Sequence, residues 1–407
     1  MRFKSRSFFL SFFIFFSLVS CSREQVSFVG REKLFTIKYG RFEDEIDLFQ
    51  LDSNSGGPDT QIFMKDGMFY ISNSGSKKIL QLTSFGDLLS VFYNPETNPE
   101  PSFSNIDNPQ SATTASTRKA IRYPFNHPVF LCVDSLKRLF VVDQVPLDRF
   151  EYDANAQVIL RDVILRFNSD GRFLDYLGQE GPGGTPFPPI SGLFNNSRNE
   201  TIVVGKTQTG LIVFWFSSDG NLLFRIPVSY KNLPSPYEAG TIVLPSLEKI
   251  IPDPDSRKIY LKIDYYVPVI DSATKANAGI IYEKSCIYPF DIPSGAYENF
   301  IDLPSFISSE KAPIGTESFK KPYEFLGITS SGWIFLSTPV QEGYVIEILD
   351  TRTRRIHKKT LSVAQNELTY NALMLSSDGI LSALLATPEE ASVVWWRTDS
   401  LIGEIRR

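Results

Sequence analysis

Short apolar runs alternate with polar turns along most of the chain beyond residue 33. In residues 129–178, four runs rich in β-branched and aromatic side chains are separated by turns such as Asn168-Ser-Asp-Gly171. This pattern predicts an antiparallel meander of four strands. One such sheet cannot cover its own apolar faces, so copies of it are expected elsewhere in the chain.

The same plan recurs along the chain. Its six units lie in residues 61–92, 129–178, 201–226, 248–288, 325–349 and 372–396. No helical periodicity accompanies them. The chain is therefore predicted to be all-β, with residues 33–407 forming a six-bladed β-propeller of four-stranded antiparallel blades.

The two ends of this region predict how the ring closes. Residues 35–40 resemble residues 173–178, where the last strand of one blade leads into the next. Residues 34–39 are therefore expected to add the outermost strand to the C-terminal blade, which removes the open edge of the ring. In the alternative, Leu401–Ile405 fills that position and the N-terminal strand becomes a fifth.

Residues 1–20 have the pattern of a targeting segment. A cationic end (Arg2, Lys4, Arg6) precedes a nearly unbroken apolar run over residues 8–19, which is too short to span a bilayer. The sequence Leu18-Val-Ser-Cys21 follows and resembles a bacterial lipobox. We therefore predict a lipoprotein signal peptide over residues 1–20 and acylation of Cys21; an ordinary secretory signal with an incidental cysteine is the alternative.

Acylation of Cys21 would anchor the protein durably, because each buried methylene of an acyl chain contributes about 0.8 kcal/mol. Residues 21–32 are then a lipidated tether, and the expected location is the bacterial cell envelope, at the outer membrane. No other run is long and apolar enough to cross a membrane.

The charge of the mature chain argues against one class of partner. The formal net charge is −5 for the full sequence, and it becomes more negative when the three basic residues of the signal peptide are removed. A nucleic-acid partner, which requires a basic footprint, is therefore not expected. The remaining cysteines, Cys132 and Cys286, lie in apolar runs; buried free thiols are expected, and a disulfide between them is left open.

Three stretches resemble the NHL repeat. They are the turn and strand from Asp134 to Asp143, the segment from Asp170 to Gly183, and residues 66–71 together with residues 78–80. The likeness covers the first two units well and the third in its second half, whereas the last three share only the strand plan. Together with the lipobox, the whole chain is similar to propeller lipoproteins of spirochaetes. The resemblance implies a fold and specifies little chemistry.

Connection lengths distinguish the two faces of the predicted ring. In a propeller, the turns between strands one and two and between strands three and four lie on one face, here called the short-turn face. These turns lie at 65–67, 168–171, 217–220 and 376–379. The opposite face, here called the long-loop face, is predicted to carry the connections 93–127, 144–157, 179–194, 228–244, 265–278 and 301–321. Long connections in a compact fold are usually functional or disordered, so a partner is expected on this face.

Aromatic side chains in these connections are candidate anchors for a partner. They are Phe150, Tyr152, Tyr265 and Tyr266. Alternatively, these rings pack back on the propeller rim, where they bury most area. Residues 95–116 are rich in Pro, Asn and Ser and are predicted to be disordered.

Motifs for catalysis are nearly absent. Neither histidine, His127 or His357, has a partner at metal-ligand spacing, and no nucleophile motif or phosphate loop occurs. No catalytic residue, metal or cofactor is predicted. Asp134 and Asp143 are interpreted as caps of their own turns, and the basic run 352–359 as a solvated turn.

Two functional hypotheses remain. The first is a non-enzymatic envelope lipoprotein whose propeller binds a protein or an envelope polymer. The second is a hydrolase resembling the calcium-dependent lactonases, which requires carboxylates from several inner strands to converge on the axis. The predicted first strands, such as residues 61–64 and 372–375, are overwhelmingly apolar, so the binding platform is favoured.

Overall fold

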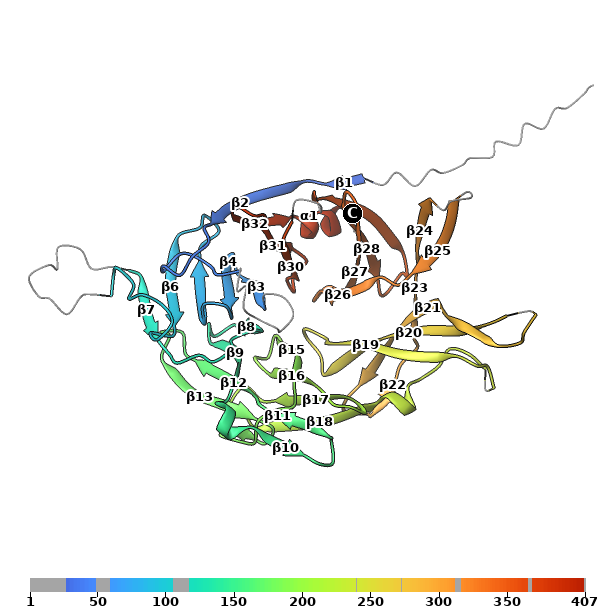
Figure 1. Cartoon of the computed structure of the whole chain (residues 1–407), viewed down its shortest axis with the longest axis horizontal. Coiled ribbons are helices and arrows are strands. Elements are labelled where there is room, and N and C mark those ends of the chain that lie inside the picture. The colour runs from blue at the N-terminus through green and yellow to red at the C-terminus, as the bar shows by residue number, and fades with distance from the viewer. Residues whose placement is uncertain are drawn as a thin grey trace, which may run out of the picture.

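A computed structural model describes residues 27–48, 59–104, 117–238, 240–271, 273–311, 316–364 and 368–405 of the chain. Its strands form six small, mostly antiparallel sheets around a central axis, which confirms the predicted six-bladed β-propeller (Figure 1). The first strand of each sheet lies nearest the axis, and later strands lie further out.

The blades follow one another in chain order. The first contains β3 (Thr60–Lys65), β4 (Met68–Asn73), β5 (Lys78–Leu82), β6 (Leu88–Tyr93) and the parallel β7 (Lys119–Arg122). The second contains β8 (Leu131–Val133), β9 (Leu139–Gln144), β12 (Asp162–Phe167), β13 (Phe173–Gly178) and β14 (Gly181–Pro182). The third contains β15 (Ile190–Asn195), β16 (Thr201–Lys206), β17 (Gly210–Phe216) and β18 (Leu222–Ser229).

The remaining three blades complete the ring. The fourth contains β19 (Leu244–Pro252), β20 (Lys258–Ile270), β21 (Asn277–Asp291), β22 (Ala296–Tyr297) and β23 (Ile301–Leu303). The fifth contains β26 (Glu324–Ile328), β27 (Trp333–Val340), β28 (Gly343–Asp350), β29 (Ile356–Ser362) and β1 (Ser27–Val29). The sixth contains β30 (Tyr370–Leu375), β31 (Leu381–Ala386), β32 (Ala391–Trp396) and β2 (Arg31–Ile37).

The N-terminal strand closes the ring, as predicted. β2 pairs antiparallel with β32, so the first and last parts of the chain lie side by side (Figure 1). The alternative for Leu401–Ile405 is wrong: this segment belongs to the helix α1 (Thr398–Ile405), whose Ile402 is buried. Residues 27–32, expected to belong to the tether, lie in β1 and at the start of β2; residues 21–26 lie outside the described residues.

The apolar core lies between neighbouring blades. The middle strands β17, β28 and β31 are buried along their whole length, because each has a blade packed on both faces. This explains why their sequences are mostly apolar and lack strict alternation. The closing strand shares this core, since Phe35 and Phe69 belong to the cluster that joins the sixth blade to the first.

Several predicted loops on the long-loop face contain strands. Residues 144–157 include the short helix η1 (Leu147–Arg149) and β10 (Glu151–Asp153), which pairs with β11 (Val158–Leu160). Residues 228–244 include η2 (Tyr230–Asn232), and residues 301–321 include the hairpin of β24 (Phe306–Lys311) and β25 (Thr316–Lys321).

Two expectations for these connections were wrong. Residues 265–278 are not a loop, because β20 and β21 continue as paired strands into this stretch and turn only between Ile270 and Asn277. Residues 95–104 are not disordered: Asn98 is buried and its side-chain amide donates to the carbonyl oxygen of Ser76 at 2.6 Å. Residues 105–116 lie outside the described residues.

Two predictions about the rest of the chain can be compared with the structure. Cys132 in β8 and Cys286 in β21 are both buried free thiols, so they do not pair with each other. Within the described residues, no helix is long and apolar enough to cross a membrane. Cys21 lies outside the described residues.

Candidate functional site

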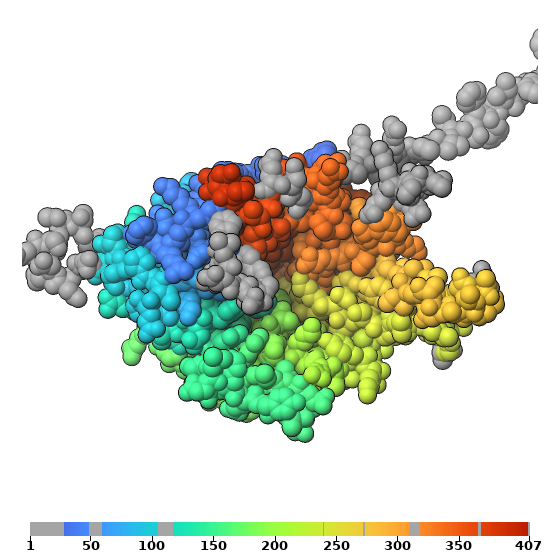
Figure 2. Space-filling model, viewed as in Figure 1, coloured from blue at the N-terminus to red at the C-terminus, as the bar shows by residue number. Residues whose placement is uncertain are grey.

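Two connected pockets open where the central channel meets the long-loop face. One has a volume of about 520 Å³ and lies between the third, fourth and fifth blades. The other, of about 580 Å³, occupies the part of the central channel nearest the long-loop face. The two pockets share Phe194, Lys249 and Glu324. Figure 2 looks onto this face, and its surface is hollowed near the centre between the orange and yellow-green blades.

The wall of the smaller pocket is rich in charge of both signs. It contains Lys206, Glu248, Lys249, Lys262, Asp264 and Glu324. These side chains come from β16, β19, β20 and β26, so three different blades contribute. The first strands were expected to leave the axis poor in polar groups; β19 and β26 instead place a lysine and a glutamate there.

Lys249 and Glu324 stand at the boundary between the two pockets. Their Nζ and Oε1 atoms are 3.7 Å apart, and both side chains remain partly exposed. Burial lowers the pKa of Lys249, and the carboxylate of Glu324 opposes this shift. The pair joins the inner strands of the fourth and fifth blades and leaves charge accessible at the channel mouth.

A second ion pair, Lys262 with Asp264, lies in the wall of the same pocket. Lys262 Nζ lies 2.7 Å from Asp264 Oδ1, and both side chains are buried. Ser285 also donates to Asp264, at 2.5 Å, and its own hydroxyl lies 2.8 Å from that of Tyr282. Burial raises the pKa of the Asp264 carboxyl, and Lys262 opposes the shift. This pair was not predicted from the sequence, although two charged residues within the mostly apolar strand β20 were a usable signal.

The two aromatic candidates near β10 have different environments. Phe150 is half-buried and packs against the core cluster of the first and second blades. Tyr152 is 66% exposed on the β10–β11 hairpin. Tyr152 therefore remains available to a partner, whereas Phe150 serves mainly to hold the hairpin on the propeller.

The other two aromatic candidates lie in β20, which corrects their prediction as loop residues. Tyr265 is fully buried, and its hydroxyl donates to the carbonyl oxygen of Pro234 at 2.7 Å. Burial raises its pKa above the usual value. Tyr266 is half-buried and packs edge-to-face on Tyr282. Tyr265 is a core residue and is not accessible to a partner.

The two aspartates interpreted as turn caps differ. Asp134 accepts hydrogen bonds from the backbone N–H groups of Leu136 and Arg138, which confirms a cap of its own turn. Asp143 instead accepts from the backbone of Asn126 and His127, so it holds the entry to the second blade. Burial raises the pKa of Asp143.

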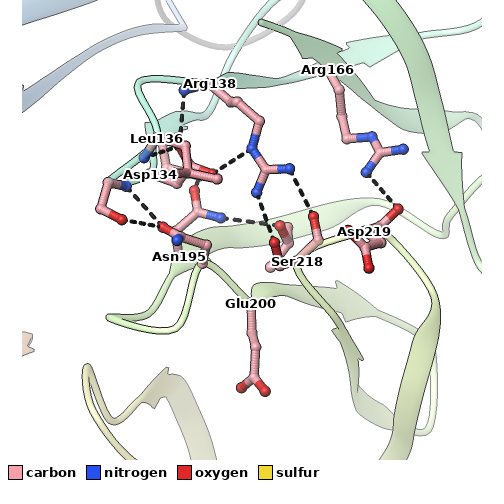
Figure 3. Close-up of polar contacts among 12 residues, drawn as sticks. Asp134, Leu136, Arg138, Arg166, Asn195, Glu200, Ser218 and Asp219 are labelled. Atoms are coloured by element: carbon pink, nitrogen blue, oxygen red, sulfur yellow. Dashed lines mark hydrogen bonds and ion pairs between the residues drawn. The ribbon is translucent and has the colours of Figure 1, made fainter. Parts of the chain in front are cut away.

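The short-turn face is fixed by polar contacts between blades (Figure 3). Arg138 donates to Asp134 in its own turn at 2.7 Å and to the carbonyl oxygen of Ser218 in the third blade at 2.8 Å. Arg166 donates to the carbonyl oxygen of Asp219 at 3.1 Å. These side chains are engaged in holding the turns together.

Glu200 continues this network to the fourth blade. Its carboxylate accepts from Trp215 Nε1 at 2.8 Å and from Arg257 Nη2 at 2.5 Å. Burial would raise its pKa, but hydrogen bonds from Arg257, Trp215 and Asn196 lower it below the ordinary value. The contact between Glu200 and Arg257 holds the third blade to the fourth. Within the described residues, no group of three or more His, Cys, Asp or Glu side chains is placed to hold a metal ion.

Among known proteins, this chain is similar to solved structures of low sequence identity. No family model matches the chain, and no curated protein matches it either. One similar solved structure is a streptogramin B lyase, with 13% sequence identity and a TM-score of 0.37; the match covers 89% of this chain and 99% of that chain. Another is a gluconolactonase from Xanthomonas campestris, with 10% identity and a TM-score of 0.41; the match covers 89% of this chain and 98% of that chain. The β-propeller domain of the Trilobed protease from Pyrococcus furiosus is also similar, with 9% identity and a TM-score of 0.38; the match covers 83% of this chain and 95% of that chain. At these identities the likeness concerns the fold alone.

Proposed function

We propose that the chain is a non-enzymatic, lipid-anchored protein of the bacterial cell envelope whose propeller binds a macromolecular partner through the long-loop face. The observation that carries this proposal is the pair of connected pockets at the channel mouth, with charged side chains from three blades. They open on the face that also carries the β10–β11 hairpin with the exposed Tyr152.

The chemistry of the pocket favours a protein partner. Lysines and carboxylates are present in equal number among its charged residues, so a partner gains most by presenting both signs of charge. A uniformly anionic polymer would meet Glu248 and Glu324 as well as the lysines. A polar protein segment that enters the mouth and lies against Tyr152 fits these surroundings better.

The membrane part of the proposal rests on the sequence. Residues 1–20 and the lipobox ending at Cys21 support export and acylation, with the outer membrane as the proposed location. Mass spectrometry of the protein purified from its native membrane tests this directly: the mature chain should begin at acylated Cys21.

Charge reversal at the pocket tests the binding face. The acylated protein is purified from its native membrane with Lys249→Glu, and bound proteins are quantified against the unaltered protein. Loss of a charged contact that becomes buried on binding should reduce partner recovery roughly tenfold or more. The matched control is Lys137→Glu, which removes a half-exposed lysine on the short-turn face that pairs with Asp66.

Each outcome decides between the hypotheses. Recovery lost with Lys249→Glu and kept with Lys137→Glu supports the long-loop face, provided that both variants unfold at the same urea concentration as the unaltered protein. Equal recovery with both variants contradicts it. Calcium-dependent hydrolysis of an aliphatic lactone that stops when calcium is chelated would instead favour the lactonase-like alternative.

A further inference from the structure

The N-terminal strand β1 enters the propeller at the outer edge of the fifth blade. It pairs parallel with β29, with Ser27 opposite Lys359 and Val29 opposite Leu361. Because the strands are parallel, the N-terminal end of β1 lies at the same end of the sheet as Ile356, the first residue of β29, and the β28–β29 turn. Ser27, the first described residue, therefore lies at this edge.

The distance from the proposed anchor to this edge is short. Ser27 is six positions after Cys21 in the sequence. A fully extended chain spans about 3.3–3.6 Å per residue, so the acylated cysteine lies within roughly 20 Å of the outer edge of the fifth blade. This step rests on the lipid anchor of the proposed function. A bilayer that holds the acyl chains is then within reach of this edge.

The same edge carries a concentration of positive charge. Arg352, Arg354 and Arg355 are exposed in the β28–β29 turn, and Lys358 and Lys359 follow in β29. Arg352 lies 3.6 Å from the largely buried Asp350. Among the described residues, no carboxylate forms an ion pair with Arg354 or Arg355.

Apolar side chains are exposed beside these charges. Phe28 in β1 is 71% exposed, and Ile356 at the start of β29 is 43% exposed. The hairpin of β24 and β25 adjoins the edge, since Lys358 Nζ in β29 lies 5.8 Å from the ring centre of Phe306 in β24. Ile307, which follows Phe306 in β24, is 67% exposed. Basic side chains interspersed with exposed apolar ones are typical of surfaces that lie in the headgroup region of a bilayer.

We propose that this edge, formed by β1, β29 and the β28–β29 turn, is a contact surface for an anionic lipid bilayer. The acyl chains hold the protein at the membrane, and the arginines of the turn orient it by contacting anionic headgroups, because each basic residue near such a surface adds attraction. One lipid anchor and one basic surface together give a firmer attachment than either alone. The basic run 352–359, expected to be a solvated turn, thereby acquires a role.

The contact also sets the orientation of the propeller. The β28–β29 turn joins the third and fourth strands of its blade, so it belongs to the short-turn face. A bilayer at this turn leaves the long-loop face, with its pockets and the β10–β11 hairpin, open to a partner. The two faces thus have separate tasks.

The test uses the acylated full-length mature protein on vesicles that carry a lipid-attached fluorescence quencher. A fluorophore is placed at Ile356→Cys, or at Tyr152→Cys as the control on the long-loop face. The native thiols of Cys132 and Cys286 are buried, so a label reacts with the introduced cysteine. Vesicles of phosphatidylcholine with phosphatidylglycerol are compared with vesicles of phosphatidylcholine alone.

The account predicts strong quenching at position 356 and weak quenching at position 152 on the anionic vesicles. The double change Arg354→Glu with Arg355→Glu should reduce quenching at 356 roughly tenfold while the protein still floats with the vesicles, because only the orienting contact is removed. A different double change, Lys119→Glu with Lys137→Glu, alters two half-exposed lysines of the first and second blades and should leave quenching at 356 unaltered.

Three results would overturn the proposal. Equal quenching at both positions on floating protein contradicts the contact and leaves the anchor intact, so the two failures can be told apart. Quenching at 356 that is unaffected by the arginine changes shows that charge does not hold this edge. Failure to float on anionic vesicles excludes both the anchor and the contact.

Discussion

Lys262 and Asp264 form a buried ion pair along one strand, with Nζ 2.7 Å from Oδ1 and 2.8 Å from Oδ2. Residues two apart in a strand point to the same side, so β20 places both side chains on the face that backs the charged pocket. The carboxylate accepts a further hydrogen bond from Ser285. A pair this well satisfied fixes the wall on which Lys249 is mounted.

Removing one member of this pair should destabilise the protein strongly. Asp264→Asn leaves the Lys262 ammonium buried without a counter-charge, and the expected loss is about 3–5 kcal/mol in the free energy of unfolding. Urea unfolding followed by tryptophan fluorescence measures it. The double change Lys262→Met with Asp264→Asn should cost less than the two single changes together, because they share one interaction. Additive losses would contradict the coupling.

Lys78 should make a contribution to the stability of the protein that increases with pH above pH 8. Its ammonium is buried at the start of β5 and donates to the carbonyl oxygen of Phe42 at 2.6 Å. Burial lowers the pKa of Lys78 from 10.5 to about 8, although nearby carboxylates, Glu45 foremost, oppose the shift.

The sign of the effect follows from proton binding. Between the folded-state pKa of about 8 and the ordinary lysine pKa of 10.5, the unfolded chain holds a proton that the folded chain has lost, so the free energy of unfolding increases with pH. The increase attributable to Lys78 is at most about 3 kcal/mol. Unfolding curves across this pH range should show it for the unaltered protein and not for Lys78→Met. Parallel profiles for the two proteins would refute the assignment.

The closing strand should be essential to the stability of the ring. Phe35 in β2 is buried, and its ring meets that of Phe69 in the first blade edge-to-face at 5.8 Å. Phe35→Ala should therefore cost about 3–5 kcal/mol in the free energy of unfolding. Phe28→Ala, in the exposed neighbouring strand β1, should change stability by no more than about 0.5 kcal/mol. A small loss for Phe35→Ala in urea unfolding would show that closure depends on other contacts.

Sequence patterns predicted the fold well because each blade repeats the same local chemistry. Turns such as Asp66-Gly67, where both residues have positive φ, connect strands in a two-residue hairpin that an Asp-Gly pair specifies. The closing strand was found through the likeness of residues 35–40 to an internal blade end. The helix α1 was missed because Leu401–Ile405 is too short to show a helical period; with the outer position of its blade already filled by β2, it packs its apolar side on the core.

The hairpin of β20 and β21 was predicted to be a loop, and its strand β20 contains Pro268. A proline cannot donate to a neighbouring strand, so it normally interrupts an interior strand. Here the pairing of β19 with β20 ends at Tyr266, which leaves Pro268 at an edge whose only neighbour is β21. The relative lengths of three strands, which no local pattern encodes, decided the outcome.

The residues of the two pockets were not predicted from the sequence. The long-loop face followed from connection lengths, but the pocket combines Lys249, Lys262, Asp264 and Glu324 from three strands of two blades. Lys262 and Asp264 share the strand β20, but the ring geometry is needed to bring them to Glu324 of the fifth blade. Aromatic residues in the predicted loops were proposed as partner contacts, but Tyr265 is buried in the core.

Photocrosslinking in intact cells tests the central claim most directly. A benzophenone amino acid is placed at Tyr152, which is 66% exposed on the long-loop face, or at Leu136, which is 55% exposed in a turn of the short-turn face. Both positions lie in the second blade, so the comparison isolates the face. The account predicts a discrete covalent adduct from position 152 that Lys249→Glu diminishes, and none from position 136. Adducts from position 136 alone, or equally from both, would contradict a binding platform on the long-loop face.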